Sequence, residues 1–184
     1  ILKSCIMKSN VESRPCLLLR CGELTLKSRR KRPFFERLYC QTIEKALWAN
    51  GVREFTLENR GGFYILYHEQ AQDILSVLLR ISGIQKISLA ECFDFNGVED
   101  LISKVVPMVK EDVANVSYAI RARRIDNNEF SAASLSIELG TLLSTENNHV
   151  DLSNPDVTVN VEVRNRDVYV FTETYDGIGG LPID

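Results

Sequence analysis

The order of two hydrophobic periodicities constrains the fold of this chain more than any other feature. Helical spacing places apolar residues on one face of a helix, whereas alternation places them on one face of a strand. Over residues 15–95 the two patterns follow one another as strand, helix, strand, strand, helix and strand. The apolar stretches that carry this pattern are 16–19, 34–47, 55–57, 63–67, 74–79 and 87–93.

The β-α-β-β-α-β order is that of the ferredoxin-like unit. Pro33 fits the first position of the first helix, where its missing N–H group leaves no hydrogen bond unmade. Asn50 and Gly51 then provide a stop signal for that helix. We therefore expect an α+β chain in which residues 1–96 form an N-terminal ferredoxin-like (βαββαβ) domain.

A second set of elements follows in residues 97–184, which we expect to form a separate α/β domain. The expected elements are a helix over 98–113, a strand over 118–123, a helix that ends near Leu143, and a hairpin over 157–172. Ser131 and Ser134 are both candidates for the N-cap of the second helix, because a serine oxygen accepts a hydrogen bond from an early helical N–H group.

Positive charge is concentrated in one segment. The chain has a net charge of −3, but seven basic and two acidic residues between Arg20 and Arg37 give that segment +5 and leave −8 on the remainder. A local basic stripe, rather than the net charge, is the electrostatic footprint of a nucleic-acid-binding protein. The candidates for phosphate contact here are Lys27, Arg29, Arg30, Lys31 and Arg32. The alternative is a solvated basic loop.

A second basic cluster, Arg121, Arg123 and Arg124, lies on an expected strand and its exit. Alternation puts Arg121 and Arg123 on one face, and two arginines on one face are not expected to point into a core. This cluster is therefore expected at the surface and is a second candidate for RNA contact. The alternative is surface ion pairing with Glu129 or Glu138.

Gly179 and Gly180 belong to a glycine-rich segment near the end of the chain. Backbone N–H groups in such a segment can approach a phosphate closely. The alternative is a tight turn that requires positive φ angles, which glycine adopts without strain.

Other residue types argue against several kinds of site. Phe34, Phe35 and Trp48 of the first expected helix are most simply core residues rather than a platform on which bases stack. The five cysteines include no CxxC pair and the two histidines lie far apart, so we expect no metal site, no disulfide framework and no nucleophilic cysteine. No apolar run approaches the roughly 18–20 residues of a membrane span. We therefore expect a cytoplasmic chain with reduced thiols.

Motifs in both halves resemble those of one known family. Residues 21–28, followed by Arg32, Phe35 and Leu38, resemble the GE-x-x-LKS…R-x-x-F-x-x-x-L opening of the 4-thiouridine tRNA sulfurtransferases, in a form close to the archaeal branch. Cys21 stands where that family usually has tyrosine. Residues 120–124, with 130–131 and 139–140, resemble the R-x-KR…F…S…G core of THUMP domains, and 150–156, 161–163 and 179–182 resemble its VDL-x-x-P-D, VE-[VI] and GGLP endings. The resemblance covers about residues 16–182.

The resemblance implies a tRNA-binding module whose THUMP surface meets the single-stranded 3′ acceptor end. In the family, the GGLP motif leads into a PP-loop domain with an SGG-x-DS loop that adenylates the target uridine. This chain shows no catalytic motif and no cofactor-binding motif, so we expect the PP-loop domain to act in cis on a longer chain or in trans. The alternatives are a fragment of a complete ATP-dependent tRNA sulfurtransferase and a protein-interaction module without an RNA role. The resemblance also allows a homodimer.

Overall fold

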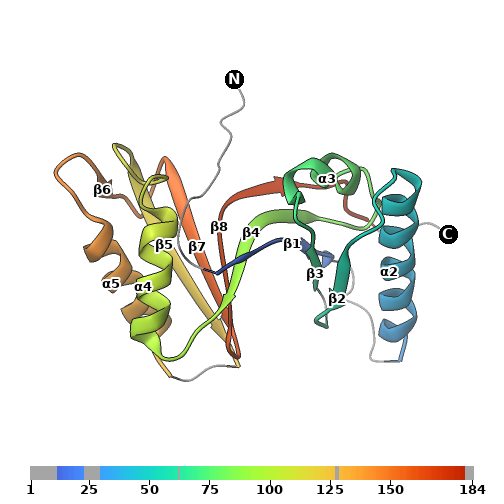
Figure 1. Cartoon of the computed structure of the whole chain (residues 1–184), viewed down its shortest axis with the longest axis horizontal. Helices are drawn as coiled ribbons and strands as arrows, with labels where there is room; N and C mark the ends of the chain where they lie inside the picture. Colours follow the sequence, from blue (N-terminus) through green and yellow to red (C-terminus); the bar gives the residue numbers. More distant parts are fainter. Residues whose placement is uncertain (1–11, 23–29, 62, 127–128, 181–184) are drawn as a thin grey trace. The chain divides into compact units, whose positions relative to one another are not determined.

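The chain divides into two compact units. The computed structural model describes residues 12–22, 30–61, 63–126 and 129–180, and Figure 1 shows their elements along the chain. We call the described residues of Arg14–Ala90 and Glu173–Asp184 the first unit, and those of Ile1–Ser13 and Glu91–Thr172 the second unit. The expected boundary between residues 96 and 97 stays a prediction.

The first unit contains the elements expected for a ferredoxin-like fold. In chain order they are β1 (Arg14–Arg20), α2 (Arg32–Ala49), β2 (Thr56–Asn59), β3 (Phe63–Tyr67), α3 (Ala71–Leu78) and β4 (Lys86–Asp94), of which residues 91–94 belong to the second unit. The strand order is β2-β3-β1-β4, and β3 pairs antiparallel with both of its neighbours. The ferredoxin-like prediction is therefore confirmed, including the helix that begins near Pro33 and ends at the C-cap Asn50.

The core of the first unit lies between its sheet and its two helices. Alternate residues of β1, Leu17 and Leu19, are fully buried in this core. They meet Tyr39, Ile43 and Leu47, which recur every four residues and so form one face of α2. This arrangement fixes which face of α2 is turned outward.

The second unit is a sheet covered by two helices. Its elements are α4 (Val98–Val109), β5 (Ser117–Ile125), α5 (Ala132–Leu143), β6 (His149–Val150), β7 (Val157–Arg164) and β8 (Asp167–Asp176), of which residues 173–176 belong to the first unit. The strand order is β8-β7-β5-β6; β5 runs parallel to β6 and β7, and β7 pairs antiparallel with β8. Figure 1 shows α4 and α5 beside the sheet, and their apolar residues share one core with it.

Two polar residues form hydrogen bonds at the ends of the second unit's helices. The Oγ of Ser131, and not that of Ser134, caps α5 by accepting a hydrogen bond from the backbone N–H of residue 134 at 3.4 Å. The buried amide of Asn148 donates to the carbonyls of Val113 and Leu143, each at 3.0 Å. Asn148 thereby joins the end of α5 to the turn after α4. Strand β6 was not expected, because two residues carry no periodicity.

The expectation that Phe34 and Trp48 belong to the core is wrong. Phe34 is 58% exposed and Trp48 is 46% exposed, whereas Phe35 is partly buried against the core of the first unit. The reason is the helical wheel: Tyr39 and Ile43 define the inward face of α2, and Phe34 and Trp48 fall on the opposite side.

Within the described residues, no helix has both the length and the apolar character that a membrane crossing requires.

Candidate RNA-binding surfaces

Strand β5 holds Arg121 and Arg123 on the face of the sheet that α4 and α5 do not cover. Ile120 and Ala122 alternate with them and pack into the core of the second unit, so Arg121 and Arg123 point the other way and are exposed. Neither arginine forms an ion pair with a described residue, Glu129 and Glu138 included. The Nη2 of Arg121 reaches the carbonyl of Leu152 at 3.5 Å, which is a marginal hydrogen-bond distance.

Arg124 does not extend the same surface. It has the parity of Ile120 and Ala122, and it lies opposite the buried Val163 in the parallel register with β7. It is exposed because it lies near the end of β5. The three arginines therefore form a pair on one face, Arg121 and Arg123, and a separate cation at the strand end.

Acidic side chains of the β6–β7 loop fix the start of β5. The carboxylate of Asp156 accepts hydrogen bonds from the Oγ of Ser117 at 2.7 Å and from its backbone N–H at 2.9 Å, and these bonds lower the pKa of Asp156. Asp151 accepts from the backbone N–H groups of Ser153 and Asn154, which lower its pKa. The VDL-x-x-P-D motif thus folds the loop that anchors the arginine-bearing strand.

The basic segment of the first unit is described only in part, since Lys27 and Arg29 lie outside the described residues. Arg30 and Lys31 are exposed at the start of α2, and neither forms an ion pair with a described residue. Arg32 is engaged instead: its Nε lies 3.0 Å from the Oε1 of Glu36, and its Nη2 donates to the carbonyl of Gly61. Arg32 therefore ties α2 to the β2–β3 turn.

Gly179 and Gly180 lie in the first unit, where their backbone groups hydrogen-bond to the segment before β4 and to α2. The N–H of Gly179 donates to the carbonyl of Ile84 at 2.8 Å, and the N–H of Gly83 donates to the carbonyl of Gly179 at 2.7 Å. The Tyr39 hydroxyl donates to the carbonyl of Gly180 at 3.2 Å. Both glycines have positive φ angles, 69° and 79°, which a turn of this kind requires. The N–H of Gly179 is thus already used within the protein.

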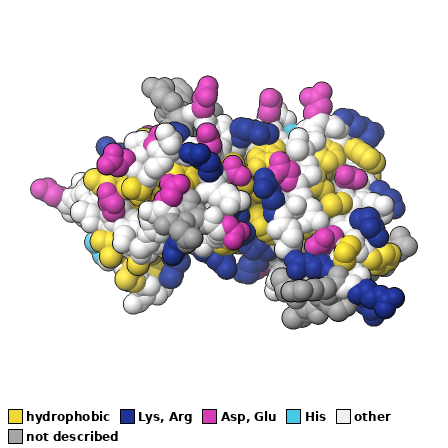
Figure 2. Space-filling view, turned by 90° about the horizontal axis from the view of Figure 1, so that it is seen from below, with side chains coloured by type: hydrophobic (Ala, Val, Ile, Leu, Met, Phe, Trp, Pro, Cys, Tyr) yellow, Lys and Arg dark blue, Asp and Glu magenta, His cyan; other side chains and the backbone are white. Residues whose placement is uncertain are grey.

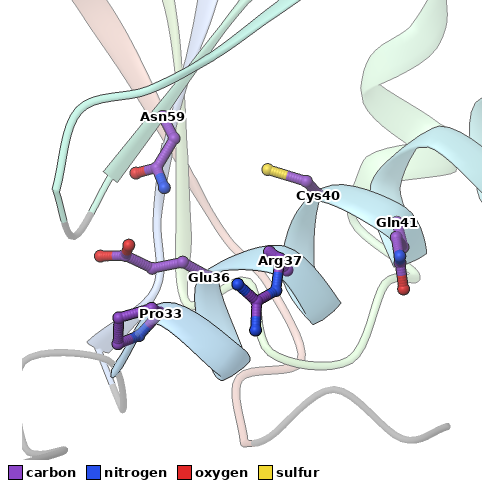
Figure 3. A pocket seen from close by; sticks show the side chains of 6 residues that line it. All are labelled: Pro33, Glu36, Arg37, Cys40, Gln41 and Asn59. Atoms are coloured by element: carbon purple, nitrogen blue, oxygen red, sulfur yellow. The ribbon is translucent and has the colours of Figure 1, made fainter. Parts of the chain in front are cut away.

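A hollow of about 330 Å³ adjoins the first turns of α2. Figure 3 shows the side chains that line it: Pro33, Glu36, Arg37, Cys40, Gln41 and Asn59. Burial, and next Glu44 and Glu36, raise the pKa of the Cys40 thiol, which favours the protonated thiol over the thiolate. Arg37 lies in the basic stripe but was not among the expected RNA contacts. The signal that could have identified it is its angle on α2, which points away from Tyr39 and Ile43.

The surface of the chain is mixed in charge. Figure 2 shows Asp and Glu side chains scattered among the Lys and Arg side chains on the face that it draws. Cys16, Cys21, Cys40 and Cys92 form no disulfide with one another. Across the described ranges, no cluster of three or more His, Cys, Asp and Glu side chains could hold a metal ion. The arginines of β5 and the outer face of α2 are therefore the candidate binding surfaces.

Two family descriptions match successive parts of the chain. The ThiI ferredoxin-like domain matches residues 16–88, and the THUMP domain matches residues 95–173. The chain is similar to the PH1313 protein of Pyrococcus horikoshii, with a TM-score of 0.79 and 28% identity over 92% of this chain and 57% of that one. It also shares its fold with a 4-thiouridine synthetase solved in complex with RNA and ATP, with a TM-score of 0.76 and 24% identity over 92% of this chain and 44% of that one.

The chain is also similar to proteins named tRNA sulfurtransferase. A probable tRNA sulfurtransferase of Sulfurisphaera tokodaii is 30% identical over 88% of this chain and 42% of its own length. A tRNA sulfurtransferase of Desulfurococcus amylolyticus is 30% identical over 91% of this chain and 34% of its own length. The chain thus spans less than half the length of these relatives. The chain therefore consists of a ThiI ferredoxin-like domain followed by a THUMP domain, and over these two domains it is similar to proteins named tRNA sulfurtransferase.

Proposed function

We propose that this chain is a tRNA-binding module that positions tRNA through its 3′ acceptor end for uridine thiolation. The thiolating chemistry, which leads to 4-thiouridine, would be supplied by a PP-loop domain in cis or in trans. Support comes from the two domains and from relatives named tRNA sulfurtransferase. A tRNA substrate is consistent with the cytoplasmic location expected from the sequence.

The observation that carries the proposal is the pair Arg121 and Arg123. A rigid strand presents both guanidinium groups to solvent on one face, and no described acid pairs with either. Guanidinium groups bind phosphates with two parallel hydrogen bonds and stack on unpaired bases. Single-stranded ends are recognised through such contacts, so the pair suits a 3′ end better than a duplex.

The basic segment of the first unit would supply a second contact. Arg30 and Lys31 are exposed, and Arg32 holds the start of α2 in place. Together with Lys27 and Arg29, they would neutralise phosphates and so orient the RNA without reading its sequence. Of the glycine-rich segment, Gly180 would be the contact, because the N–H of Gly179 already donates to Ile84.

A second candidate function has one specific observation in its favour. The chain spans 42% and 34% of two relatives named tRNA sulfurtransferase. We therefore keep the alternative that it is a piece of a complete ATP-dependent tRNA sulfurtransferase. ATP hydrolysis by this chain with tRNA would contradict the division of labour proposed here.

Fluorescence anisotropy with intact and 3′-trimmed tRNA tests the proposal. We expect binding that weakens steeply with salt, since phosphate contacts release counterions, and weaker binding when the four 3′-terminal nucleotides are removed. Equal affinity for the two RNAs would rule out the acceptor-end contact, and the absence of any tRNA binding would rule out the module itself.

A further inference from the structure

The outward face of α2 carries aromatic and basic side chains in one stripe. The exposed residues Phe34, Arg37, Gln41, Lys45 and Trp48 recur at intervals of three and four along this helix. At 3.6 residues per turn they fall within an arc of about 80°. This arc lies opposite the buried side chains of α2. The five residues, which we call the α2 stripe, therefore form a single surface.

The stripe combines exposed aromatic side chains with cations, which is unusual for a helix face that contacts only solvent. Its two ends are large aromatic side chains, Phe34 at 58% exposure and Trp48 at 46%. They are 14 residues apart, or about 21 Å along the helix axis. Arg37 and Lys45 lie between them, and neither forms an ion pair with a described residue. Glu44 is half-buried on one flank of the stripe.

The ring of Phe34 is held in place before any ligand arrives. It meets the ring of Phe35 edge to face, with centroids 5.5 Å apart, and Phe35 packs against the core of the first unit. A platform of this kind loses little conformational freedom when a flat group stacks on it. Arg37 lies one helical turn from Phe34, and Arg37 and Gln41 both line the hollow shown in Figure 3.

We propose that the α2 stripe binds unpaired RNA nucleotides, with bases stacked on Phe34 and Trp48 and phosphates neutralised by Arg37 and Lys45. Aromatic platforms between cations are how proteins hold single-stranded nucleic acid without sequence preference. Unpaired RNA suits the stripe better than a duplex, whose bases are already stacked on each other. Charge favours RNA over an apolar protein helix, because the exposed cations on the stripe need an anionic partner. This inference rests on the proposed tRNA-binding function and extends it to a third surface.

Trp48 is the single tryptophan of the sequence, so its fluorescence reports directly on the stripe. The full chain would be titrated with an end-labelled, mixed-sequence single-stranded oligoribonucleotide. Anisotropy of the label measures binding, and Trp48 emission and its quenching by acrylamide measure stacking. We expect RNA to quench Trp48 at least 2-fold and to protect it from acrylamide. The same oligoribonucleotide in a duplex should do so less.

Variants separate the stripe from the other surfaces. Phe34→Ala should weaken binding of the single strand by roughly 5-fold or more, the lower end for loss of one base stack. Ile137→Ala removes an apolar side chain on α5 that is even more exposed, at 71%, and should change affinity less than 2-fold. Lys45→Glu should also weaken binding, whereas Lys110→Glu at the end of α4 should not. Circular dichroism melts would confirm that each variant is folded.

The outcomes distinguish this inference from the function on which it rests. If the RNA binds but Trp48 emission and acrylamide quenching stay unchanged, the inference is overturned, tRNA binding stands, and the helix face is left to a protein partner. Equal affinities for Phe34→Ala and Ile137→Ala would overturn it in the same way. If the single strand does not bind but intact tRNA does, this inference fails alone; if neither RNA binds, the proposed tRNA-binding function fails with it.

Discussion

Removal of both guanidinium groups from β5 is the most informative perturbation of the second unit. In Arg121→Ala/Arg123→Ala the strand should stay folded, because both side chains are exposed and the one described hydrogen bond, from Arg121 to Leu152, is marginal. Exposed substitutions of this kind change the free energy of unfolding by about 0.5 kcal/mol or less. Any large change in RNA affinity would therefore come from lost contacts with RNA.

The expected loss follows from counterion release. For single-stranded nucleic acid, the logarithm of the binding constant falls with the logarithm of salt concentration by roughly 0.7 per phosphate neutralised. Two lost contacts should reduce the steepness of that dependence by about 1.4. If the two proteins bind equally at 1 M salt, the variant should bind roughly 25-fold more weakly than the unmodified chain at 0.1 M salt. This difference corresponds to about 2 kcal/mol of binding free energy.

The assay is a salt series of tRNA-binding anisotropy with the unmodified chain, the double variant and a matched control. The control, Arg80→Ala/Lys110→Ala, removes the same charge from exposed positions outside the predicted RNA contacts. It should run parallel to the unmodified chain, and the double variant should be less steep. Parallel lines for all three proteins would refute the reasoning, because Arg121 and Arg123 would then neutralise no phosphate.

Three further predictions concern stability. Gly83→Ala should destabilise the chain by about 2–4 kcal/mol in chemical denaturation, since the new Cβ would lie 2.3 Å from the Tyr39 ring at a φ of +100°. The control Gly51→Ala, with a φ of +82° and no atom within 4 Å, should cost only the backbone strain. Equal losses of stability in the two variants would exclude the clash. Hydrogen bonds lower the pKa of Asp156, so the stability that they provide should be present above the ordinary carboxyl pKa and lost as pH falls through the lowered value; an Asp156→Ala variant should show less of this acid dependence in thermal melts. Burial raises the pKa of Glu91, so the folded state binds the Glu91 proton more tightly than the unfolded state, and stability falls as pH rises. Glu91→Gln should therefore raise the melting temperature at pH 7. A lower melting temperature would show that the carboxylate is stabilising.

The order of the elements, and the two faces of strand β5, could be predicted because hydrophobic periodicity follows burial. The alternation that separates Arg121 and Arg123 from Ile120 is local in the sequence, and the structure places these side chains on opposite faces. The role of Gly179 could not be predicted, because its hydrogen-bond partner Ile84 is far away in the chain.

The outward position of Phe34 and Trp48 could not be predicted from residue type. Aromatic residues are core residues by default, and only their angle relative to Tyr39 and Ile43 shows that they face outward. Arg32 gives the opposite lesson: within a basic run it looks like its neighbours, yet Glu36, one turn along the helix, engages it. Charge runs therefore identify a candidate surface but not which cations remain available on it.

The central claim is that this chain binds tRNA at its acceptor end, and hydroxyl-radical footprinting of tRNA bound to the chain tests it most directly. We predict protection of the 3′-terminal nucleotides and the adjoining acceptor stem, and its loss at the 3′ end in Arg121→Ala/Arg123→Ala. Protection confined to the anticodon arm, or a 3′ footprint unchanged in the double variant, would contradict the account.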